Sequence, residues 1–157
     1  MGKRLEYLNI TVNIHTQVGK TKLYEVVVVD SKSRVMIPSK VRDLLGLSSG
    51  TILMLIADTE TREIRMLPLA NAESKVYQLR IVMSDKPGAL AKVAQALANY
   101  GVDLLFTVSK TIRREEVAEW TIIADFSKSK ANEEKIVDKL KKQDIVREVE
   151  IVSVKRK

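Results

Sequence analysis

Four positively charged side chains lie at a turn and along a helix in one short stretch of the chain, residues 24–47. Lys32 and Arg34 lie in a polar turn, and Lys40 and Arg42 lie on a short amphipathic helix that we predict to follow the turn. Cations on protruding elements suit a polyanion, because a nucleic-acid backbone is a dense row of negative charges. The simpler alternative is a solvated basic surface, which is the usual explanation for scattered charges.

The elements that must position these cations follow an order that is unusual for a buried core. We predict an apolar strand at Val26–Val29, a polar turn at Asp30–Arg34, a three-residue strand at Val35–Ile37, and a helix that follows Pro38. This order resembles the AbrB/SpoVT family of swapped-hairpin DNA-binding domains. The residues that carry the resemblance are Asp30, Ser33-Arg34, Val35, Ile37-Pro38, Arg42, Leu44-Leu45-Gly46-Leu47 and Ser48-Ser49-Gly50.

The resemblance implies a homodimer in which two copies interleave their hairpins into a β-barrel-like unit that binds double-stranded DNA. The implied DNA contacts are the basic residues of this region, namely Lys32, Arg34, Lys40, Arg42, Lys20 and Lys22. Two positions depart from the family pattern. Ser33 replaces the usual Gly of the turn, although Gly reaches positive φ at less cost than Ser. Asp43 replaces a second Arg of the helix and removes one phosphate contact.

Composition excludes several classes of site. The chain has no Cys and one His, His15, so thiolate metal sites and Cys/His nucleophilic pairs are ruled out. No spacing of carboxylates or nucleophiles suggests catalysis, and we expect neither an enzyme nor a bound metal or cofactor. No apolar run approaches the ~18 residues of a membrane span, and the first residues do not resemble a signal peptide. We therefore expect a cytoplasmic protein without a membrane partner.

The net charge of +7 is unevenly distributed along the chain. Residues 1–42 contain eight Lys/Arg and three Asp/Glu, whereas residues 43–75 contain three Lys/Arg and five Asp/Glu. Much of the positive excess therefore lies in the N-terminal quarter, where the family motif also lies.

The sequence predicts an α+β chain with two domains. Residues 1–23 form an N-terminal extension in which alternating apolar residues allow an extra strand, and residues 24–72 form the AbrB-like domain. Two further strands, at Thr51–Ile56 and Glu63–Leu67, belong to that domain. A short joint near residue 72 leads to a second domain at residues 76–154.

The second domain changes to a strand-helix-strand rhythm. Alternation from Tyr77 to Met83 predicts a strand, and helical spacing from Leu90 to Ala98 predicts a helix that stops at Gly101. Two strands, a second helix and a last strand follow, and we expect Trp120 in the core. This βαββαβ order predicts a ferredoxin-like fold, an antiparallel sheet with both helices on one face.

The element order and the motif Asp85-Lys86-Pro87-Gly88-Ala89-Leu90 resemble the ACT domain, a module that senses small molecules. In that family the loop closes over an amino acid, often across a dimer interface, with help from an Asn that begins the second strand. The implied ligand-binding residues are Asp85, Pro87, Gly88, Ala89, Leu90 and Asp103, which stands where the family has Asn. A purely structural turn at this motif is an equally good explanation.

Three classes of function fit these features. The leading hypothesis is a dimeric or higher-order transcription regulator that binds DNA and senses an amino acid. The second is an interaction protein such as an antitoxin of the MazE type, although the folded C-terminal half argues against it. The third is a regulatory subunit of a biosynthetic enzyme, which would leave the basic N-terminal surface without a use.

Overall fold

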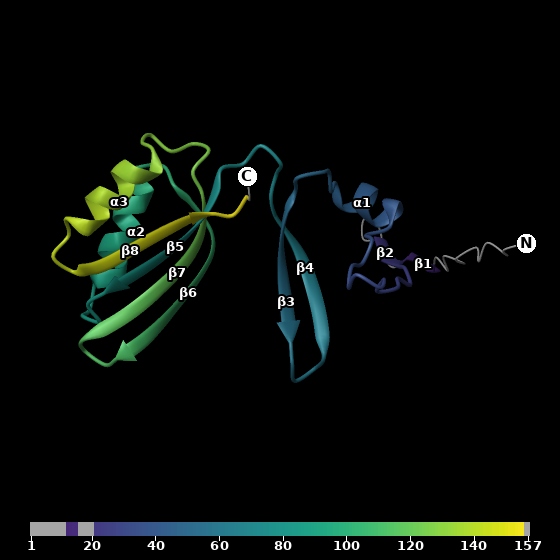
Figure 1. Ribbon diagram of the computed structural model, residues 1–157, viewed down its shortest axis with the longest axis horizontal. Helices are drawn as coiled ribbons and strands as arrows, with labels where there is room; N and C mark the ends of the chain where they lie inside the picture. The colour runs from purple at the N-terminus through teal and green to yellow at the C-terminus, as the bar shows by residue number, and fades with distance from the viewer. Residues whose placement is uncertain (1–11, 16–20, 156–157) are drawn as a thin grey trace, which may run out of the picture. The chain divides into compact units, whose positions relative to one another are not determined.

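The computed structural model describes residues 12–15 and 21–155, and the chain divides into two compact units, residues 1–49 and 50–157 (Figure 1). In the first unit, β1 (Val12–His15) pairs antiparallel with β2 (Thr21–Tyr24). The extra strand predicted in the N-terminal extension is therefore confirmed over the four residues of β1.

The single chain does not form the two strands predicted at Val26–Val29 and Val35–Ile37, so this prediction is wrong for one chain. Neither segment has a partner strand within the described residues, so no ladder of hydrogen bonds forms along them. Only the turn between them is closed, because Asp30 N–H donates to Arg34 O at 2.9 Å and Ser33 N–H donates to Asp30 O at 2.9 Å. An apolar, β-branched run is a strand only when a neighbouring strand accepts its backbone hydrogen bonds.

The predicted helix is present as α1 (Ser39–Leu45), directly after Pro38. Pro suits this place because its missing N–H would have no helical partner. The helix ends at Gly46, whose φ of 65° allows Leu47 N–H to donate to Arg42 O at 2.8 Å.

The second unit begins with a β-hairpin formed by β3 (Ile52–Asp58) and β4 (Glu63–Ala70). A polar turn at Asp58–Thr61 joins these two strands. Its Asp58 carboxylate accepts hydrogen bonds from Thr61 N–H at 3.0 Å and Glu60 N–H at 2.9 Å, and these bonds lower the pKa of Asp58. β4 extends past Pro68 to Ala70, so the linker to the next strand consists of residues 71–75.

The rest of the second unit is a four-stranded antiparallel sheet in the order β6-β7-β5-β8, with α2 and α3 on one face (Figure 1). Its elements are β5 (Val76–Met83), α2 (Ala89–Asn99), β6 (Asp103–Arg113), β7 (Val117–Asp125), α3 (Glu133–Lys141) and β8 (Val146–Ser153). This is the ferredoxin-like βαββαβ order, and that part of the predicted fold class is confirmed.

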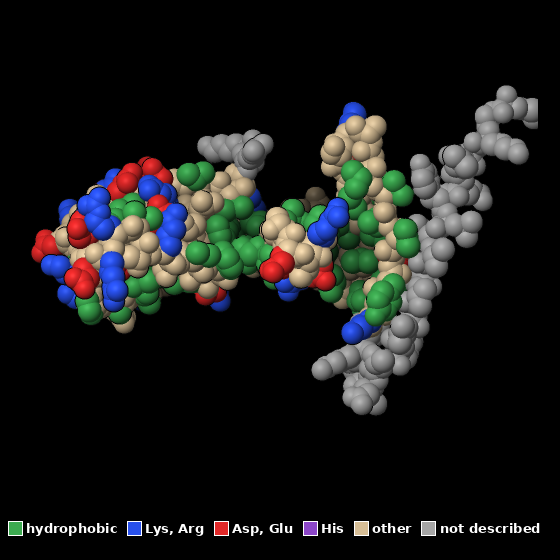
Figure 2. Space-filling view, turned by 90° about the horizontal axis from the view of Figure 1, so that it is seen from below, with side chains coloured by type: hydrophobic (Ala, Val, Ile, Leu, Met, Phe, Trp, Pro, Cys, Tyr) green, Lys and Arg blue, Asp and Glu red, His purple; other side chains and the backbone are tan. Residues whose placement is uncertain are grey.

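The buried core lies between this sheet and its two helices. Every other residue of β5 and β7 points toward the helices, and Leu79, Ile81 and Ile122 are fully buried. Trp120 is only 4% exposed, which confirms its predicted place in the core. In Figure 2, acidic and basic side chains are interspersed over the part of the molecule that contains α2 and α3.

No described helix combines the length and apolar character that crossing a membrane requires.

Candidate functional site

One cavity of about 170 Å³ lies at the end of the four-stranded sheet where β5 leads into α2. Three segments supply its walls, namely the loop before α2, the second half of β6 and the start of β7. The residues that line it are Met83, Ser84, Asp85, Lys86, Ala89, Leu90, Ser109, Lys110, Thr111, Ala118, Glu119 and Trp120. This volume equals about six water molecules at liquid density, so the cavity has room for a small molecule such as a small amino acid.

The motif that resembles the ACT ligand loop forms part of this cavity. Ala89 is 4% exposed, whereas Pro87, Gly88 and Leu90 are exposed to solvent. The loop therefore presents its backbone, with one apolar side chain packed inward.

Asp85 ties the loop to the turn between β6 and β7. Its Oδ2 accepts a hydrogen bond from Glu115 N–H at 2.9 Å, and its Oδ1 accepts one from the Thr111 hydroxyl at 3.3 Å. Glu115 adopts a positive φ of 64°, a conformation that an L-residue holds only when its surroundings support it. The Asp85 carboxylate is thus occupied by the protein itself and positions one wall of the cavity.

Gly88 is required at the start of α2 because its φ is 85°. Ala89 N–H donates to Lys86 O at 3.1 Å, which closes the loop as a turn. The amides of Gly88 and Leu90 have no acceptor among the described residues. These two N–H groups, at the positive end of the α2 dipole, are the ones available to an anionic group.

Asp103 lies far from this loop within one chain. It begins β6 and pairs in register with Asp125, whereas Thr111, at the cavity, pairs with Ala118. Eight residues of strand separate Asp103 from Thr111, which corresponds to roughly 26 Å. The single chain therefore does not bring Asp103 together with the other predicted ligand residues.

The linker between the β3–β4 hairpin and the sheet is hydrogen-bonded at the end of β7 that lies away from the cavity. Lys75 N–H donates to the Ser127 hydroxyl at 2.9 Å, and Phe126 N–H donates to Lys75 O at 2.8 Å. Partial burial raises the pKa of Asp125, but hydrogen bonds from Ser127, Ser74 and Lys75 outweigh this and leave that pKa below its ordinary value. The end of the sheet thus holds the linker through several hydrogen bonds.

The predicted DNA-binding turn is ordered by its own acidic residue. The Asp30 carboxylate accepts from Arg34 Nε at 2.9 Å and Nη2 at 2.7 Å, and from the backbone N–H groups of Lys32 and Arg34 at 2.9 Å each. Hydrogen bonds from the Arg34 guanidinium are the main reason why the pKa of Asp30 is lowered. Ser33 has a φ of 59°, so it takes the positive-φ conformation of the Gly that it replaces.

The other predicted cations lie in the same unit. Arg42 Nη1 donates to Ile37 O at 2.5 Å, which fixes the start of α1. Lys40 is exposed on α1, and Lys22 is exposed on β2. Lys20 lies outside the described residues.

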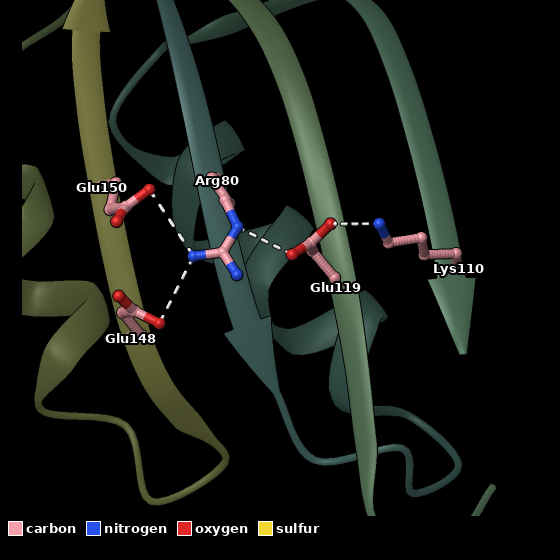
Figure 3. Close-up of polar contacts among 5 residues, drawn as sticks. All are labelled: Arg80, Lys110, Glu119, Glu148 and Glu150. Atoms are coloured by element: carbon pink, nitrogen blue, oxygen red, sulfur yellow. Dashed lines mark hydrogen bonds and ion pairs between the residues drawn. The ribbon is translucent and has the colours of Figure 1, made fainter. Parts of the chain in front are cut away.

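Sequence reasoning missed a row of charges on the face of the sheet that is turned away from the helices (Figure 3). Lys110 binds Glu119 at 2.8 Å, and Glu119 binds Arg80 at 2.7 Å. Arg80 lies a further 3.4 Å from Glu148 and 3.5 Å from Glu150. Hydrogen bonds from Lys110 and Arg80 lower the pKa of Glu119. Alternation along these strands could have predicted which residues share this face, but their alignment depends on the register of four strands.

Comparisons with known proteins bear on the C-terminal half. Residues 77–144 match the family model of the ACT domain. This match confirms the ACT domain predicted there. No curated protein matches the chain.

Several solved structures match about half of the chain, among them the following three. An uncharacterized protein from Thermotoga maritima is 27% identical, with a TM-score of 0.41, and the match covers 53% of this chain and 100% of that protein. The ACT domain of GTP pyrophosphokinase from Chlorobium tepidum is 18% identical, with a TM-score of 0.41, over 50% of this chain and 99% of that domain. The C-terminal domain of MgtC from Mycobacterium tuberculosis is 17% identical, with a TM-score of 0.42. That match covers 53% of this chain and 90% of the MgtC domain.

Proposed function

We propose that this protein is a dimeric, DNA-binding transcription regulator whose ACT domain binds a small-molecule effector of the amino-acid class. The observation that carries the proposal is an ordered cationic turn between two apolar segments that the single chain leaves exposed. Such an arrangement has a use when a second copy covers the apolar segments and the turn faces a polyanion.

Exposure of the apolar side chains supports the dimer. Val28 is 64% exposed, Met36 is 80% exposed, and Leu55 and Ile64 of the β3–β4 hairpin are also exposed. Exposure of several large apolar side chains within each unit marks interaction surfaces. Within the described part of the chain, residues 26–37 also lack the partner strand that their composition suits. The AbrB/SpoVT resemblance implies that the second copy supplies that strand by interleaving its hairpins.

Geometry of the turn supports DNA binding. Asp30 fixes the backbone of Lys32 and Arg34, so the backbone that carries these side chains needs no further ordering on binding. Arg42 and Lys40 project from α1 in the same unit. We assign the phosphate contacts to Lys32, Arg34, Lys40 and Arg42, and smaller contributions to Lys22 and Lys20.

The cavity supports the effector. Its volume suits a small amino acid, and the N–H groups of Gly88 and Leu90 are placed to receive a carboxylate at the start of α2. Asp85, Pro87 and Ala89 shape the loop. In one chain Asp103 is too distant to take part, so a role for it needs a second copy, as the family's binding across a dimer interface implies.

The proposal assigns no reaction and no metal or cofactor to the chain. Its partners are double-stranded DNA, the effector and a second copy, and its place is the cytoplasm. The regulatory-subunit alternative shares the effector but not the DNA, so DNA binding separates the two.

The test of DNA binding is fluorescence anisotropy of a labelled random duplex titrated with the full chain at low and high salt. We expect affinity to fall steeply as salt rises, because binding releases counterions. Lys32→Ala and Arg42→Ala should each weaken binding by about 1–3 kcal/mol, whereas Lys141→Ala, on the exposed side of α3, should change it little. Equal effects of all three variants, or no binding at low salt, would contradict the proposal.

The test of the effector is a thermal-shift series of the full chain against the twenty amino acids. A ligand present at about a hundred times its Kd should add ~2.7 kcal/mol to the free energy of unfolding. Stabilisation by an amino acid without DNA binding would favour the regulatory subunit. Absence of stabilisation by every amino acid would contradict the effector half of the proposal.

A further inference from the structure

The four-stranded sheet has one face covered by α2 and α3 and one face without helices, which we name the open sheet face (Figure 1). Residues that alternate with the buried ones project from it, and the strand register aligns them in rows. One row runs Phe106, Ile123, Gln78 and Val152 across β6, β7, β5 and β8. The next row, two residues along each strand, is Val108, Thr121, Arg80 and Glu150, and the row after it is Lys110, Glu119, Val82 and Glu148.

The charges on this face alternate in sign from one edge of the sheet to the other (Figure 3). Lys110 on β6 is positive, Glu119 on β7 is negative, Arg80 on β5 is positive, and Glu148 and Glu150 on β8 are negative. The outermost members are the most exposed. The side chain of Lys110 is 61% exposed, whereas that of Glu119, in the middle, is 12% exposed.

Apolar side chains stand exposed beside the charges. Val152 is 65% exposed, Val108 is 50% exposed and Phe106 is 40% exposed. Such a face can pack against a surface whose charges and apolar residues complement its own.

We propose that the open sheet face packs against the same face of a second copy, around a two-fold axis that runs parallel to the strands. Rotation about this axis reverses the order of the strands. The sequence positive, negative, positive, negative then meets its own reverse, so each charge faces or lies diagonal to one of opposite sign. Lys110 lies opposite Glu148 of the partner subunit, and Arg80 lies two residues along the strand from the position that faces Glu119 of the partner subunit.

The same rotation matches the apolar row. Phe106 on one outer strand lies opposite the partner subunit's Val152, which is on the other outer strand. A two-fold axis perpendicular to the strands would instead place like charges over one another when the charged rows overlap, which costs free energy. The charge pattern therefore selects a second copy as the occupant and one orientation for it. This inference does not depend on DNA binding or on an effector.

Intermolecular contact between these positions can be distinguished from contact within one chain. β6 and β8 are the outer strands, with β7 and β5 between them. Three strand spacings of about 4.8 Å separate Phe106 from Val152 by roughly 14 Å, which is beyond the reach of a disulfide. The chain has no Cys of its own, so introduced thiols report on these positions alone.

The test is oxidative crosslinking of the full chain that carries Phe106→Cys and Val152→Cys. We expect a covalent dimer as the main product under mild oxidation at low protein concentration. The matched control carries Phe106→Cys and Glu148→Cys, on the same two strands but about 13 Å out of register. Both variants keep the N-terminal unit, so its association raises crosslinking equally in both. The control should therefore remain largely monomeric on a denaturing gel.

A second measurement tests the charge pairing. Glu148→Lys with Glu150→Lys, added to the Phe106→Cys and Val152→Cys chain, should slow crosslinking. Further addition of Lys110→Glu should restore part of the rate, because Lys110 contacts neither Glu148 nor Glu150 within one chain. A cysteine pair that crosslinks no faster than the out-of-register control would overturn the proposal. Failure of Lys110→Glu to restore any of the rate would overturn the orientation.

Discussion

Residues 76–149 and residues 22–75 differ in how they bury their apolar side chains. The sheet and helices of residues 76–149 contain all the buried hydrophobic residues of the described chain, from Val76 to Val149. Residues 22–75 contain none, although Val26–Val29 is as apolar as any strand of the sheet. The ACT domain thus completes its core within one chain, whereas the N-terminal segment and the β3–β4 hairpin do not.

Conformational entropy makes this difference informative. Ordering each residue costs about 1–2 kcal/mol, and burial of apolar surface must offset it. Residues 22–75 obtain little of that burial within one chain. Their stability must therefore come from association, which is why we attribute the exposed apolar segments to a dimer.

The largest effect is expected for a substitution in the core that the ACT domain completes within one chain. Leu97 of α2 is fully buried, so Leu97→Ala should lower the free energy of unfolding of the ACT domain by about 2–5 kcal/mol. The loss should be the same at low and high protein concentration, because the core belongs to one chain. Chemical denaturation at two concentrations measures this, and a loss that varies with concentration would contradict it.

The next prediction concerns the exposed apolar segment of the N-terminal part of the chain. Val28→Asp should weaken the dimer by about 2 kcal/mol or more, because a second copy would bury the new carboxylate without a partner. Sedimentation equilibrium of the full chain measures this. Ala98→Asp, at an exposed position of α2, is the matched control and should leave association unchanged. Equal association of both variants with the unaltered chain would show that Val28 stays in solvent.

A smaller effect is expected at the effector loop. No atom lies within 4 Å of a Cβ built on Gly88, so the first carbon of a side chain there meets no close neighbour. Its φ of 85° still disfavours any L-side chain, and strain of this kind costs about 1–3 kcal/mol. We expect Gly88→Val to abolish stabilisation by the effector in thermal-shift measurements while DNA affinity without effector stays near normal. Full retention of the effector shift would remove Gly88 from the site.

The smallest effect concerns pH. Asp125 has a pKa below its ordinary value of 3.8, so its contribution to stability is present above that value and is lost as pH falls through the lowered pKa. Asp125→Asn should therefore reduce stability at neutral pH slightly and flatten the acid limb of the stability curve below about pH 4. Thermal melts between pH 3 and pH 7 measure this, and an unchanged acid limb would exclude Asp125 as the cause.

Sequence alone predicted the ACT domain well because its signals are local. Alternation in β5, helical spacing in α2 and the positive φ required at Gly88 each depend on a few neighbouring residues. The cavity could not be predicted in full, because Ser109 and Thr111 meet the loop only through the register of β6. Asp103 was grouped with the loop from family resemblance, and the strand length separates them.

The N-terminal prediction shows the opposite case. Val26–Val29 and Val35–Ile37 have the composition of strands, but a strand also needs a partner, which lies outside these segments. Composition therefore indicated a property of the assembly rather than of the single chain. The turn between them was predictable, because Asp30 and Arg34 are close in sequence and their contact is local.

The most direct test of the central claim is amide hydrogen exchange of the full chain, with and without duplex DNA. The account predicts that residues 26–37 are strongly protected without DNA, since a second copy pairs with them, and that residues 30–42 gain further protection on DNA. Exchange of residues 26–37 at the rate of an unstructured peptide in both conditions would contradict the account. That result would mean that the exposed apolar segments have no partner and that the cationic turn has no ordered interface to serve.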